Sequence, residues 1–301
     1  MFGSRSRDGD HAIWAYAFGY FACYAPYVAL TKAISLGRLP GLTRPIGGLE
    51  LLPVASLASL VGMFVFLTSL GWWRYAGRRV VFGIDLPVPN RWTFLSGLAT
   101  ACIIATTTLA YTFSGVSIVF MMLLMRGGLL VIAPLVDVAS GRRVSWYSGV
   151  ALALSIGALI VATVGPTSYE LTLVALLDVV VYLSAYVVRL RFMSHLAKSK
   201  ARPEAIRYFV EEQMVATPVI VVALVVLALV GSGEAMRSIR TGFVSIWGSG
   251  GLASAIVIGL LSQGTGVFGG LILLDGRENT FCVPVNRASS VLAGVLASVV
   301  L

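Results

Sequence analysis

The chain has 301 residues, of which 58% are hydrophobic and only 12% are charged. A soluble domain carries about 25% charged residues, so this composition excludes an ordinary soluble protein. The formal net charge of +9 would suggest nucleic-acid binding in a soluble chain. Here the basic residues lie in short connections between apolar segments, where membrane topology and anionic lipid explain them. We expect a protein embedded in a lipid bilayer, with no nucleic-acid partner.

The cysteines and histidines predict neither a disulfide framework nor a metal site. Cys23, Cys102 and Cys282 fall within apolar segments, and their odd number and unpaired spacing are not those of a zinc site. His11 and His195 share no ligand spacing with any other residue. We therefore expect no metal and no cofactor.

An N-terminal tail of mixed charge leads into an apolar segment too long for the core of a signal peptide. Nine apolar segments follow one another, each with the roughly 20 residues that a helix needs to cross the hydrocarbon core. Because hydrocarbon offers no partner for backbone groups, each segment is predicted to be α-helical. The segments are residues 12–34, 50–72, 92–113, 116–138, 146–164, 170–190, 207–230, 250–274 and 280–301.

The basic residues in the connections predict the orientation of the chain. Counted together with the adjoining ends of the segments, the N-terminal tail and the second, fourth, sixth and eighth connections carry 15 Lys and Arg residues, whereas the other connections carry five. Arg189 is counted with the sixth connection. The positive-inside rule then places the N-terminus in the cytoplasm. Short loops and richness in Ala, Val, Gly and Arg favour a bacterial inner membrane.

Several residues recur at a nearly constant spacing, which predicts an internal repeat. The recurring positions are Tyr20 with Tyr182, Tyr24 with Tyr186 and Glu50 with Glu212, all 162 residues apart, and Arg126 with Arg287, 161 apart. A further match, SGLATACII from Ser96 with GGLASAIVI from Gly250, has a spacing of 154.

The matched segments are offset by five spans. Because five is an odd number, the second copy is predicted to be inverted across the membrane, a recurring plan of secondary transporters. We expect an all-α polytopic bundle of two inverted five-helix repeats. Residues 1–165 form the first repeat and residues 166–301 the second, of which four spans are present. A tenth span is expected after Leu301, so nine spans are present here.

The chain resembles the drug/metabolite transporter superfamily, with its EamA-like architecture of ten spans in two repeats. The most specific stretch is MRGGLLVIAPLVDVASGRRVSWYSGVALALSIGALIVAT, residues 125–163. In it Asp137 ends a span, a basic turn follows at residues 141–143, and Gly149 and Gly157 lie in a closing helix. The segment at residues 125–127 is similar to the branch of nucleotide-sugar and chloroquine-resistance-type carriers. The resemblance implies a central cavity lined by the first, third, fourth, sixth, eighth and ninth spans.

Two arginines in equivalent spans are the main candidates for a binding site. Arg126 and Arg287 lie near the middle of their segments, where an arginine costs roughly 2.5–3.5 kcal/mol on insertion scales. Such residues either bind a carboxylate or phosphate of a solute, or pair with a buried carboxylate such as Asp178 or Glu212. Asp178 could also load and unload a proton. Glu211 and Glu212 are expected near a membrane edge, in contact with solvent.

Aromatic and amide side chains are expected to complete this site. Tyr20 and Tyr24, and likewise Tyr182 and Tyr186, are four residues apart and share a helix face. They are predicted either to line a cavity or to pack helices together. Gln263, and Asn286 beside Pro284, add polar groups at mid-depth.

These features predict a transporter that moves a small polar or anionic organic solute by alternating access. The sequence contains no clustered nucleophile, acid or metal set, so we do not expect an enzyme. A structural or receptor-like membrane protein is the other alternative, although it would need neither the two arginines nor the repeat. The expected partners are a small-molecule substrate and the lipid bilayer, and a homodimer is compatible with the sequence.

Overall fold

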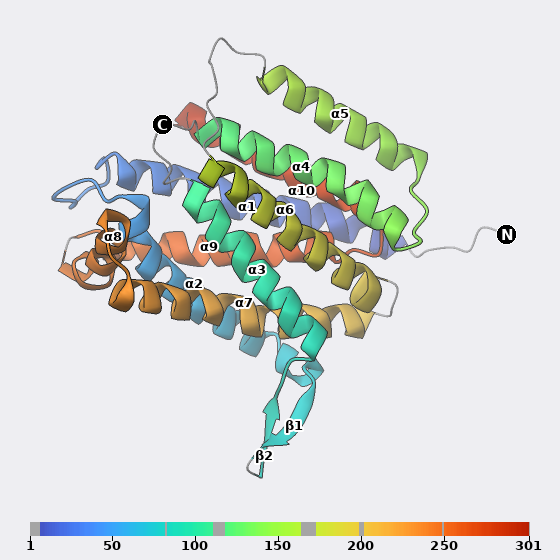
Figure 1. Cartoon of the computed structure of the whole chain (residues 1–301), viewed down its shortest axis with the longest axis horizontal. Coiled ribbons are helices and arrows are strands. Elements are labelled where there is room, and N and C mark those ends of the chain that lie inside the picture. The colour runs from blue at the N-terminus through green and yellow to red at the C-terminus, as the bar shows by residue number, and fades with distance from the viewer. Residues whose placement is uncertain are drawn as a thin grey trace.

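A computed structural model of the protein describes residues 7–81, 83–110, 118–163, 173–198, 202–248 and 250–300 (Figure 1). Ten α-helices account for most of these residues, which confirms the all-α prediction. The helices are α1 (Arg7–Ser35), α2 (Gly48–Ser69), α3 (Arg91–Ala110), α4 (Ile118–Ala139), α5 (Trp146–Thr163), α6 (Leu173–Met193), α7 (Arg202–Val230), α8 (Glu234–Val244), α9 (Leu252–Leu273) and α10 (Asn279–Val300). All nine apolar segments of the sequence coincide with one of these helices.

Within the described residues, four helical segments are both long and apolar enough to cross a membrane. They are Gly48–Ser69, Leu173–Lys198, Pro203–Val230 and Leu252–Leu273. The outer surface of the bundle is also apolar, since large side chains such as Phe18, Val61 and Leu229 are more than half exposed. A surface of this kind is stable in hydrocarbon rather than in water, which indicates a membrane protein.

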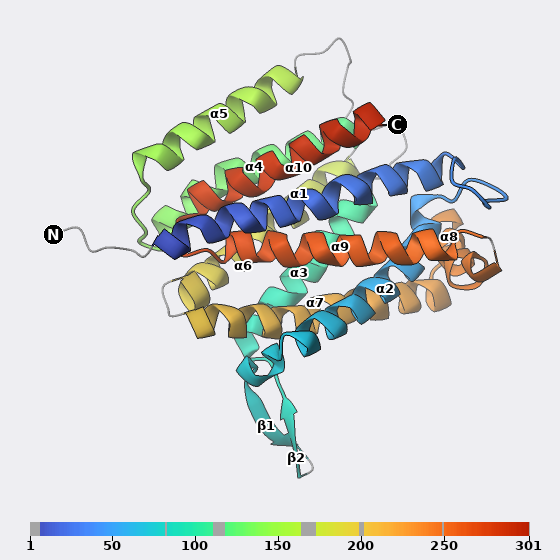
Figure 2. The same cartoon turned by 180° about the vertical axis from the view of Figure 1, so that it is seen from behind.

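Two of the connections expected to be loops contain secondary structure. The connection after α2 forms a 3₁₀ turn, Trp72–Tyr75, and then an antiparallel hairpin of β1 (Arg78–Val81) and β2 (Ile84–Pro87). Val81 pairs with Ile84, and Gly83 has a φ of +78° in the tight turn between them, a conformation that glycine adopts readily. The connection after α7 contains α8. The hairpin projects sideways, across the helix axes, in both views (Figures 1 and 2).

Two sets of helices pack in the same way. Helix α1 packs against α9 and α10, while α6 packs against α3 and α4. Helix α2 lies on α9, α7 lies on α3, and the two central contacts are α2 with α7 and α4 with α10. Helix α5 lies at the edge, against α4 and α10 (Figure 2).

Glycines permit two of these close crossings. A Cβ atom added at Gly97 of α3 would lie 2.5 Å from Cβ of Val215 in α7. A Cβ added at Gly259 of α9 would lie 2.3 Å from the carbonyl oxygen of Ala55 in α2. Small residues at helix crossings allow the backbones to approach, which is how helices associate in membranes.

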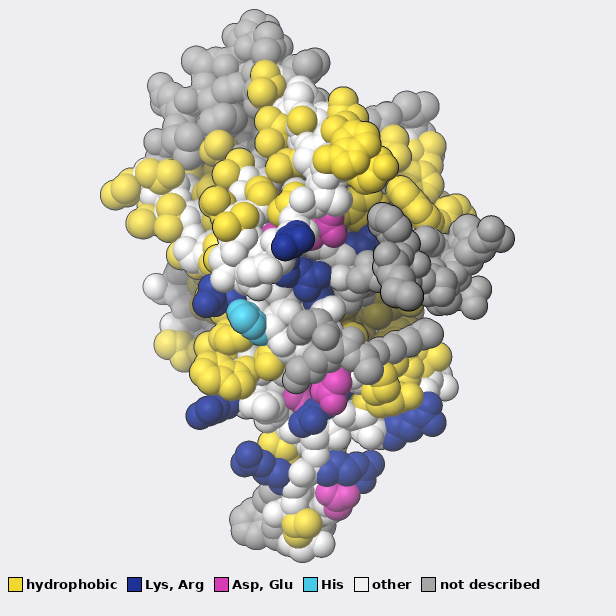
Figure 3. Space-filling view, turned by 90° about the vertical axis from the view of Figure 1, so that its right-hand side faces the viewer, with side chains coloured by type: hydrophobic (Ala, Val, Ile, Leu, Met, Phe, Trp, Pro, Cys, Tyr) yellow, Lys and Arg dark blue, Asp and Glu magenta, His cyan; other side chains and the backbone are white. Residues whose placement is uncertain are grey.

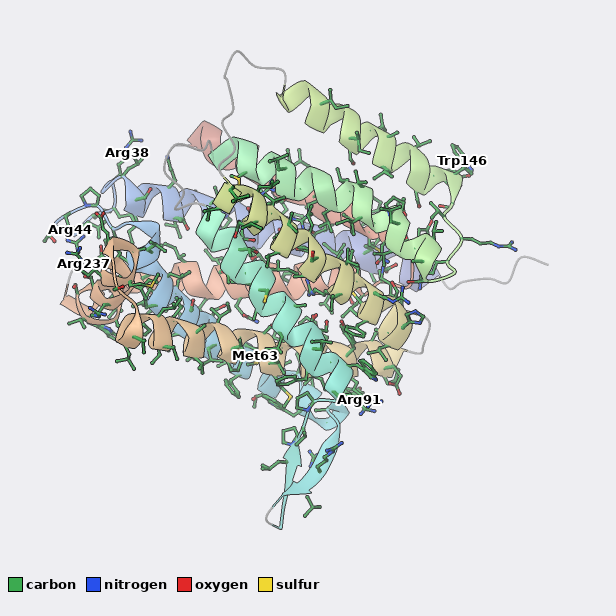
Figure 4. The ribbon with its side chains drawn as sticks, in the orientation of Figure 1. Arg38, Arg44, Met63, Arg91, Trp146 and Arg237 are labelled. Carbon is green, nitrogen blue, oxygen red and sulfur yellow. The ribbon has the colours of Figure 1, made fainter. Side chains whose placement is uncertain are left out.

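The connections alternate between the two ends of the bundle. Arg38, Arg44 and Arg237 lie at the end that carries α8, whereas Arg91 and Trp146 lie toward the other (Figure 4). This second end carries the connections at residues 70–90, 140–145 and 274–278. We call it the basic end because of the Lys and Arg residues in these connections. Lys and Arg side chains are spread over it (Figure 3).

Candidate functional site

Two tyrosine pairs face one another across the centre of the bundle. In α1, Tyr20 and Tyr24 stack with ring centroids 5.4 Å apart and an interplanar angle of 13°. In α6, Tyr182 and Tyr186 make an edge contact at 4.9 Å and 62°. The four-residue spacing places each pair on one helix face. All but Tyr24 are buried, and Tyr24 is half-buried.

Each pair meets one of the predicted arginines. Nη2 of Arg126 donates a hydrogen bond of 3.1 Å to the hydroxyl of Tyr24. Nη2 of Arg287 donates a hydrogen bond of 2.9 Å to the hydroxyl of Tyr186, and its guanidinium lies 5.6 Å from the centre of that ring. Arg126 and Arg287 are each the ninth residue of a 22-residue helix, α4 and α10 respectively.

The two halves of this arrangement form one cluster. Both guanidinium groups lie within electrostatic range of the Tyr20 and Tyr182 hydroxyls. Asn286 joins them beside Tyr20: a Cβ added at Gly269 would lie 3.0 Å from the Tyr20 ring and 3.2 Å from Nδ2 of Asn286. We call these seven residues the tyrosine–arginine cluster: Tyr20, Tyr24, Arg126, Tyr182, Tyr186, Asn286 and Arg287.

The cluster carries two positive charges that no carboxylate neutralises among the described residues. Neither Arg126 nor Arg287 forms an ion pair within that part of the chain. Nε of Arg287 is buried and has no hydrogen-bond partner. Both arginines are partly buried. Removing a charge from water is costly unless the charge is paired, so this pair of guanidinium groups favours an anion beside them.

Asp178 lies one helical turn before Tyr182 but does not contact either arginine. Asp178 is 5% exposed, and both of its carboxylate oxygens are buried without a hydrogen-bond partner. The interpretation that Asp178 neutralises Arg126 therefore finds no contact in the structure. Its role as a site of proton coupling stays a prediction.

Glu212 pairs with Arg189 instead of the cluster arginines. Its carboxylate accepts bonds of 2.8 and 2.9 Å from Nε and Nη2 of Arg189, and bonds of 2.9 Å from the hydroxyls of Ser96 and Thr100. The expectation that Glu212 contacts solvent at a membrane edge is wrong, because the residue is 0% exposed. Helices α3, α6 and α7 meet at this ion pair.

Glu211 is also buried, contrary to the same expectation. It fixes the base of the hairpin to α7 by accepting hydrogen bonds from the backbone N–H groups of Gly77 (2.9 Å) and Asn90 (3.0 Å), from the Thr93 hydroxyl (2.6 Å) and from Nε of Arg207 (2.8 Å). Two of these partners, Gly77 and Asn90, lie in a connection expected to be a loop, so hydropathy could not predict that this carboxylate is buried.

Gln263 belongs to a separate polar bridge. Its amide oxygen accepts a 2.9 Å hydrogen bond from the Ser59 hydroxyl, and its Nε2 donates a 3.4 Å bond to Gln213. The bridge joins α2, α7 and α9. These hydrogen bonds connect helices and do not bring Gln263 to the tyrosine–arginine cluster.

At the basic end, two acidic residues cap helices from other parts of the chain. Asp137 accepts hydrogen bonds of 3.0 and 2.7 Å from the backbone N–H groups of Asn279 and Thr280, at the start of α10. Glu278 accepts hydrogen bonds of 2.6 Å from the hydroxyls of Ser145 and Ser148, at the start of α5. A carboxylate at a helix N-terminus satisfies free N–H groups and complements the helix dipole.

The pKa of Glu278 reflects these contacts. Partial burial raises the pKa of this carboxyl, but the hydrogen bonds from Ser145 and Ser148 outweigh burial and hold the pKa at about 2. The sequence contained one usable signal for the cap, since serine directly before a predicted helix is a preferred N-cap residue. Nothing in the sequence indicated that the partner would be Glu278.

Two hollows lie beside the hairpin. One, of about 380 Å³, is lined by Gly77, Arg78, Arg79, Val88, Pro89, Asn90, Arg91 and Arg207. The other, of about 440 Å³, is lined by Met63, Phe64, Thr68, Trp73, Pro87 and Met214. Neither is lined by a residue of the tyrosine–arginine cluster.

Comparison with known proteins adds no family to this description. No protein-family model matches the chain, and no curated protein matches it in sequence. Function has to be inferred from the arrangement of the side chains.

Proposed function

We propose that the protein is a membrane transporter that moves a small polar or anionic organic solute by alternating access. The observation that carries this proposal is the tyrosine–arginine cluster, in which two partly buried guanidinium groups have tyrosine partners and no carboxylate partner among the described residues. The planar fork of arginine suits a carboxylate or phosphate group, and the tyrosine rings offer stacking surface to the rest of a solute.

The helix packing supports two inverted repeats, α1–α5 and α6–α10. If α1 is exchanged with α6, α2 with α7, α3 with α9 and α4 with α10, the contacts among these eight helices reproduce themselves. The packing of α1 on α9 and α10 becomes that of α6 on α3 and α4, and α2 on α9 becomes α7 on α3. Under this proposal α8 and the hairpin occupy equivalent connections, and nine helices cross the membrane.

Individual contacts support the same exchange. The bond from Arg126 to Tyr24 has its counterpart in the bond from Arg287 to Tyr186. Glu50 is buried and pairs with Arg44 through both carboxylate oxygens, as Glu212 does with Arg189. The glycines at the two crossings, Gly97 and Gly259, are also 162 residues apart. This differs from the spacing of 154 found by matching letters in the same two helices.

The proposal extends to family and orientation. The EamA-like architecture of the drug/metabolite transporter superfamily accommodates both the repeat and a central anion site between its halves. The basic end then faces the cytoplasm, and a bacterial inner membrane suits the small connections. The rival interpretation is that each Arg–Tyr bond serves only to hold helices together in a structural or receptor-like protein.

A binding experiment separates these interpretations. Purified protein is screened by thermal shift against metabolite anions, nucleotides and amino acids, and any hit is titrated against Arg126→Ala, Arg287→Ala and the control Arg191→Ala, which removes an exposed arginine of α6. Hydrogen bonds to charged groups contribute about 1.5–3 kcal/mol, so each cluster variant should bind roughly 10- to 100-fold more weakly, whereas the control should bind normally. Unchanged binding by both cluster variants would refute the arginine site.

A further inference from the structure

The two hollows beside the hairpin lie on one face of α7, at different depths. Arg207 lines the basic hollow and Met214 lines the apolar one. Seven residues of helix separate them, which corresponds to roughly 10 Å along the helix axis. Helix α7 starts at the basic end, so the apolar hollow is the deeper one in the membrane. Met63 and Arg91 mark the two levels in Figure 4.

The shallower hollow has the chemistry of an anion site. Four arginines line it, Arg78, Arg79, Arg91 and Arg207, and Asp85 and Glu211 offset two of them through ion pairs of 2.8 Å. Arg79 and Arg91 form no ion pair among the described residues. Arg79 and Arg91 are exposed, so their guanidinium groups are accessible to a phosphate.

The hollow is preformed, because its floor is fixed to the bundle. Glu211 binds the backbone N–H groups on both sides of the hairpin base, and Val88 donates a 2.7 Å hydrogen bond to the carbonyl of Gly77. A Cβ at position 77 would lie 2.8 Å from Nη2 of Arg207 and 3.2 Å from the carbonyl oxygen of Val88, so a larger residue there would displace the Arg207 side chain.

The deeper hollow is an apolar slot with an ordered aromatic wall. Phe64 and Trp73 stack at 5.7 Å, and Nε1 of Trp73 donates a 2.9 Å hydrogen bond to the Thr68 hydroxyl. Tryptophans are enriched where membrane hydrocarbon meets the headgroups. The guanidinium of Arg91 lies 4.7 Å from the centre of the Trp92 ring, and Trp92 is exposed, which places the basic hollow at headgroup level.

We infer that this pair of hollows binds one anionic phospholipid, with its phosphate against Arg79 and Arg91 and an acyl chain in the slot between Phe64 and Met214. The charge of the shallower, basic hollow matches a lipid headgroup, and the apolar lining of the deeper hollow matches an acyl chain. Their order in depth is that of the two parts of a lipid. The sideways hairpin, with Val80 and Leu86 exposed, lies over the headgroups under this arrangement (Figures 1 and 2). The inference depends on membrane insertion and not on the proposed transport.

Lipid titration of the purified full-length protein tests the inference. Native mass spectrometry compares retention of phosphatidylglycerol with that of phosphatidylcholine in the wild type, in Arg79→Ala/Arg91→Ala, and in the charge-matched control Arg38→Ala/Arg237→Ala at the opposite end. We expect preferential retention of phosphatidylglycerol, weakened by about fivefold for each arginine removed at the site and unchanged in the control. Equal loss in both double variants would mean a general charge effect and overturn the site.

Two further arms separate lipid from a free anion. Met214→Trp fills the slot and should weaken retention of phosphatidylglycerol without changing the basic hollow; unaltered retention would refute the acyl-chain site. Inorganic phosphate should not compete with phosphatidylglycerol at equal concentration. Full competition by phosphate would show that the arginines form a free-anion site instead. Failure of solute binding in the cluster variants would leave all of these outcomes unchanged.

Discussion

Replacing Glu212 by glutamine is expected to destabilise the bundle strongly. The wild-type carboxylate is fully buried and accepts four hydrogen bonds, two of them from Arg189, whose side chain is 8% exposed. Glutamine keeps the size of the side chain but leaves the guanidinium without a counter-charge and directs an N–H₂ group toward a donor. Removing one partner of a buried ion pair costs about 3–5 kcal/mol.

The expected shift can be measured as a change in Tm. At about 2–4 °C per kcal/mol for a chain of comparable size, Glu212→Gln should melt roughly 6–20 °C below the wild type. Glu234→Gln, at an exposed position of α8, is the control and should melt with the wild type. Replacing both partners, as Arg189→Met/Glu212→Leu, should restore much of the loss, because an apolar pair of similar volume avoids burying a lone charge. A Tm for Glu212→Gln equal to that of the wild type would refute the reasoning.

Two more predictions concern the acidic residues Asp178 and Glu278. Asp178→Asn should leave the Tm of the protein unchanged or raise it at neutral pH, because it removes a buried ionisable group that has no partner; a marked fall in Tm would show that the carboxylate makes an essential contact. If Asp178 couples transport to protons, the same variant should lose the pH dependence of solute uptake in proteoliposomes. The folded-state pKa of Glu278, about 2, lies below its ordinary value of 4.5, so the ionised carboxylate stabilises the fold above pH 4.5 and this contribution is lost as pH falls toward 2. Glu278→Gln should therefore have a lower Tm than the wild type at pH 7, with the two curves of Tm against pH converging near pH 2; a constant difference would contradict the Ser145 and Ser148 contacts.

The long helices could be predicted because their physical requirement is simple. A segment of about 20 apolar residues has to satisfy its own backbone in hydrocarbon, and helix does so. Helix α8 could not be predicted in this way, because its segment EAMRSIRTGFV is short and carries polar residues on one face. The hairpin could not be predicted either, because its strands, RRVV and IDLP, have four residues each and are too short to show a clear alternation of apolar and polar residues.

Six of the seven members of the tyrosine–arginine cluster could be predicted because they recur at nearly one spacing. Two arginines and four tyrosines that repeat at 161 or 162 residues are brought together by symmetry, without knowledge of any individual contact. Gln263 has no such counterpart, and its assignment to the same site rested on depth alone. The structure places it in the bridge with Ser59 and Gln213.

The sequence does not distinguish an arginine that pairs with a buried carboxylate from one that does not, as Arg189 illustrates. It lies near the end of α6, so counting charges by connection assigned it to the cytoplasmic surface, yet in the structure it is buried and paired with Glu212. That carboxylate had been the candidate partner for the central arginines. Its engagement with Arg189 leaves Arg126 and Arg287 with tyrosine hydroxyls, which cannot neutralise them as neutral groups. Two kinds of arginine therefore coexist. The charge of Arg189 is balanced by Glu212, so its loss should affect stability. Arg126 and Arg287 are partly buried and have no carboxylate partner among the described residues, so under the proposed function their loss should affect binding. Comparing Tm and solute affinity across Arg189→Met, Arg126→Ala and Arg287→Ala tests that division directly, and equal loss of Tm in all three would abolish it.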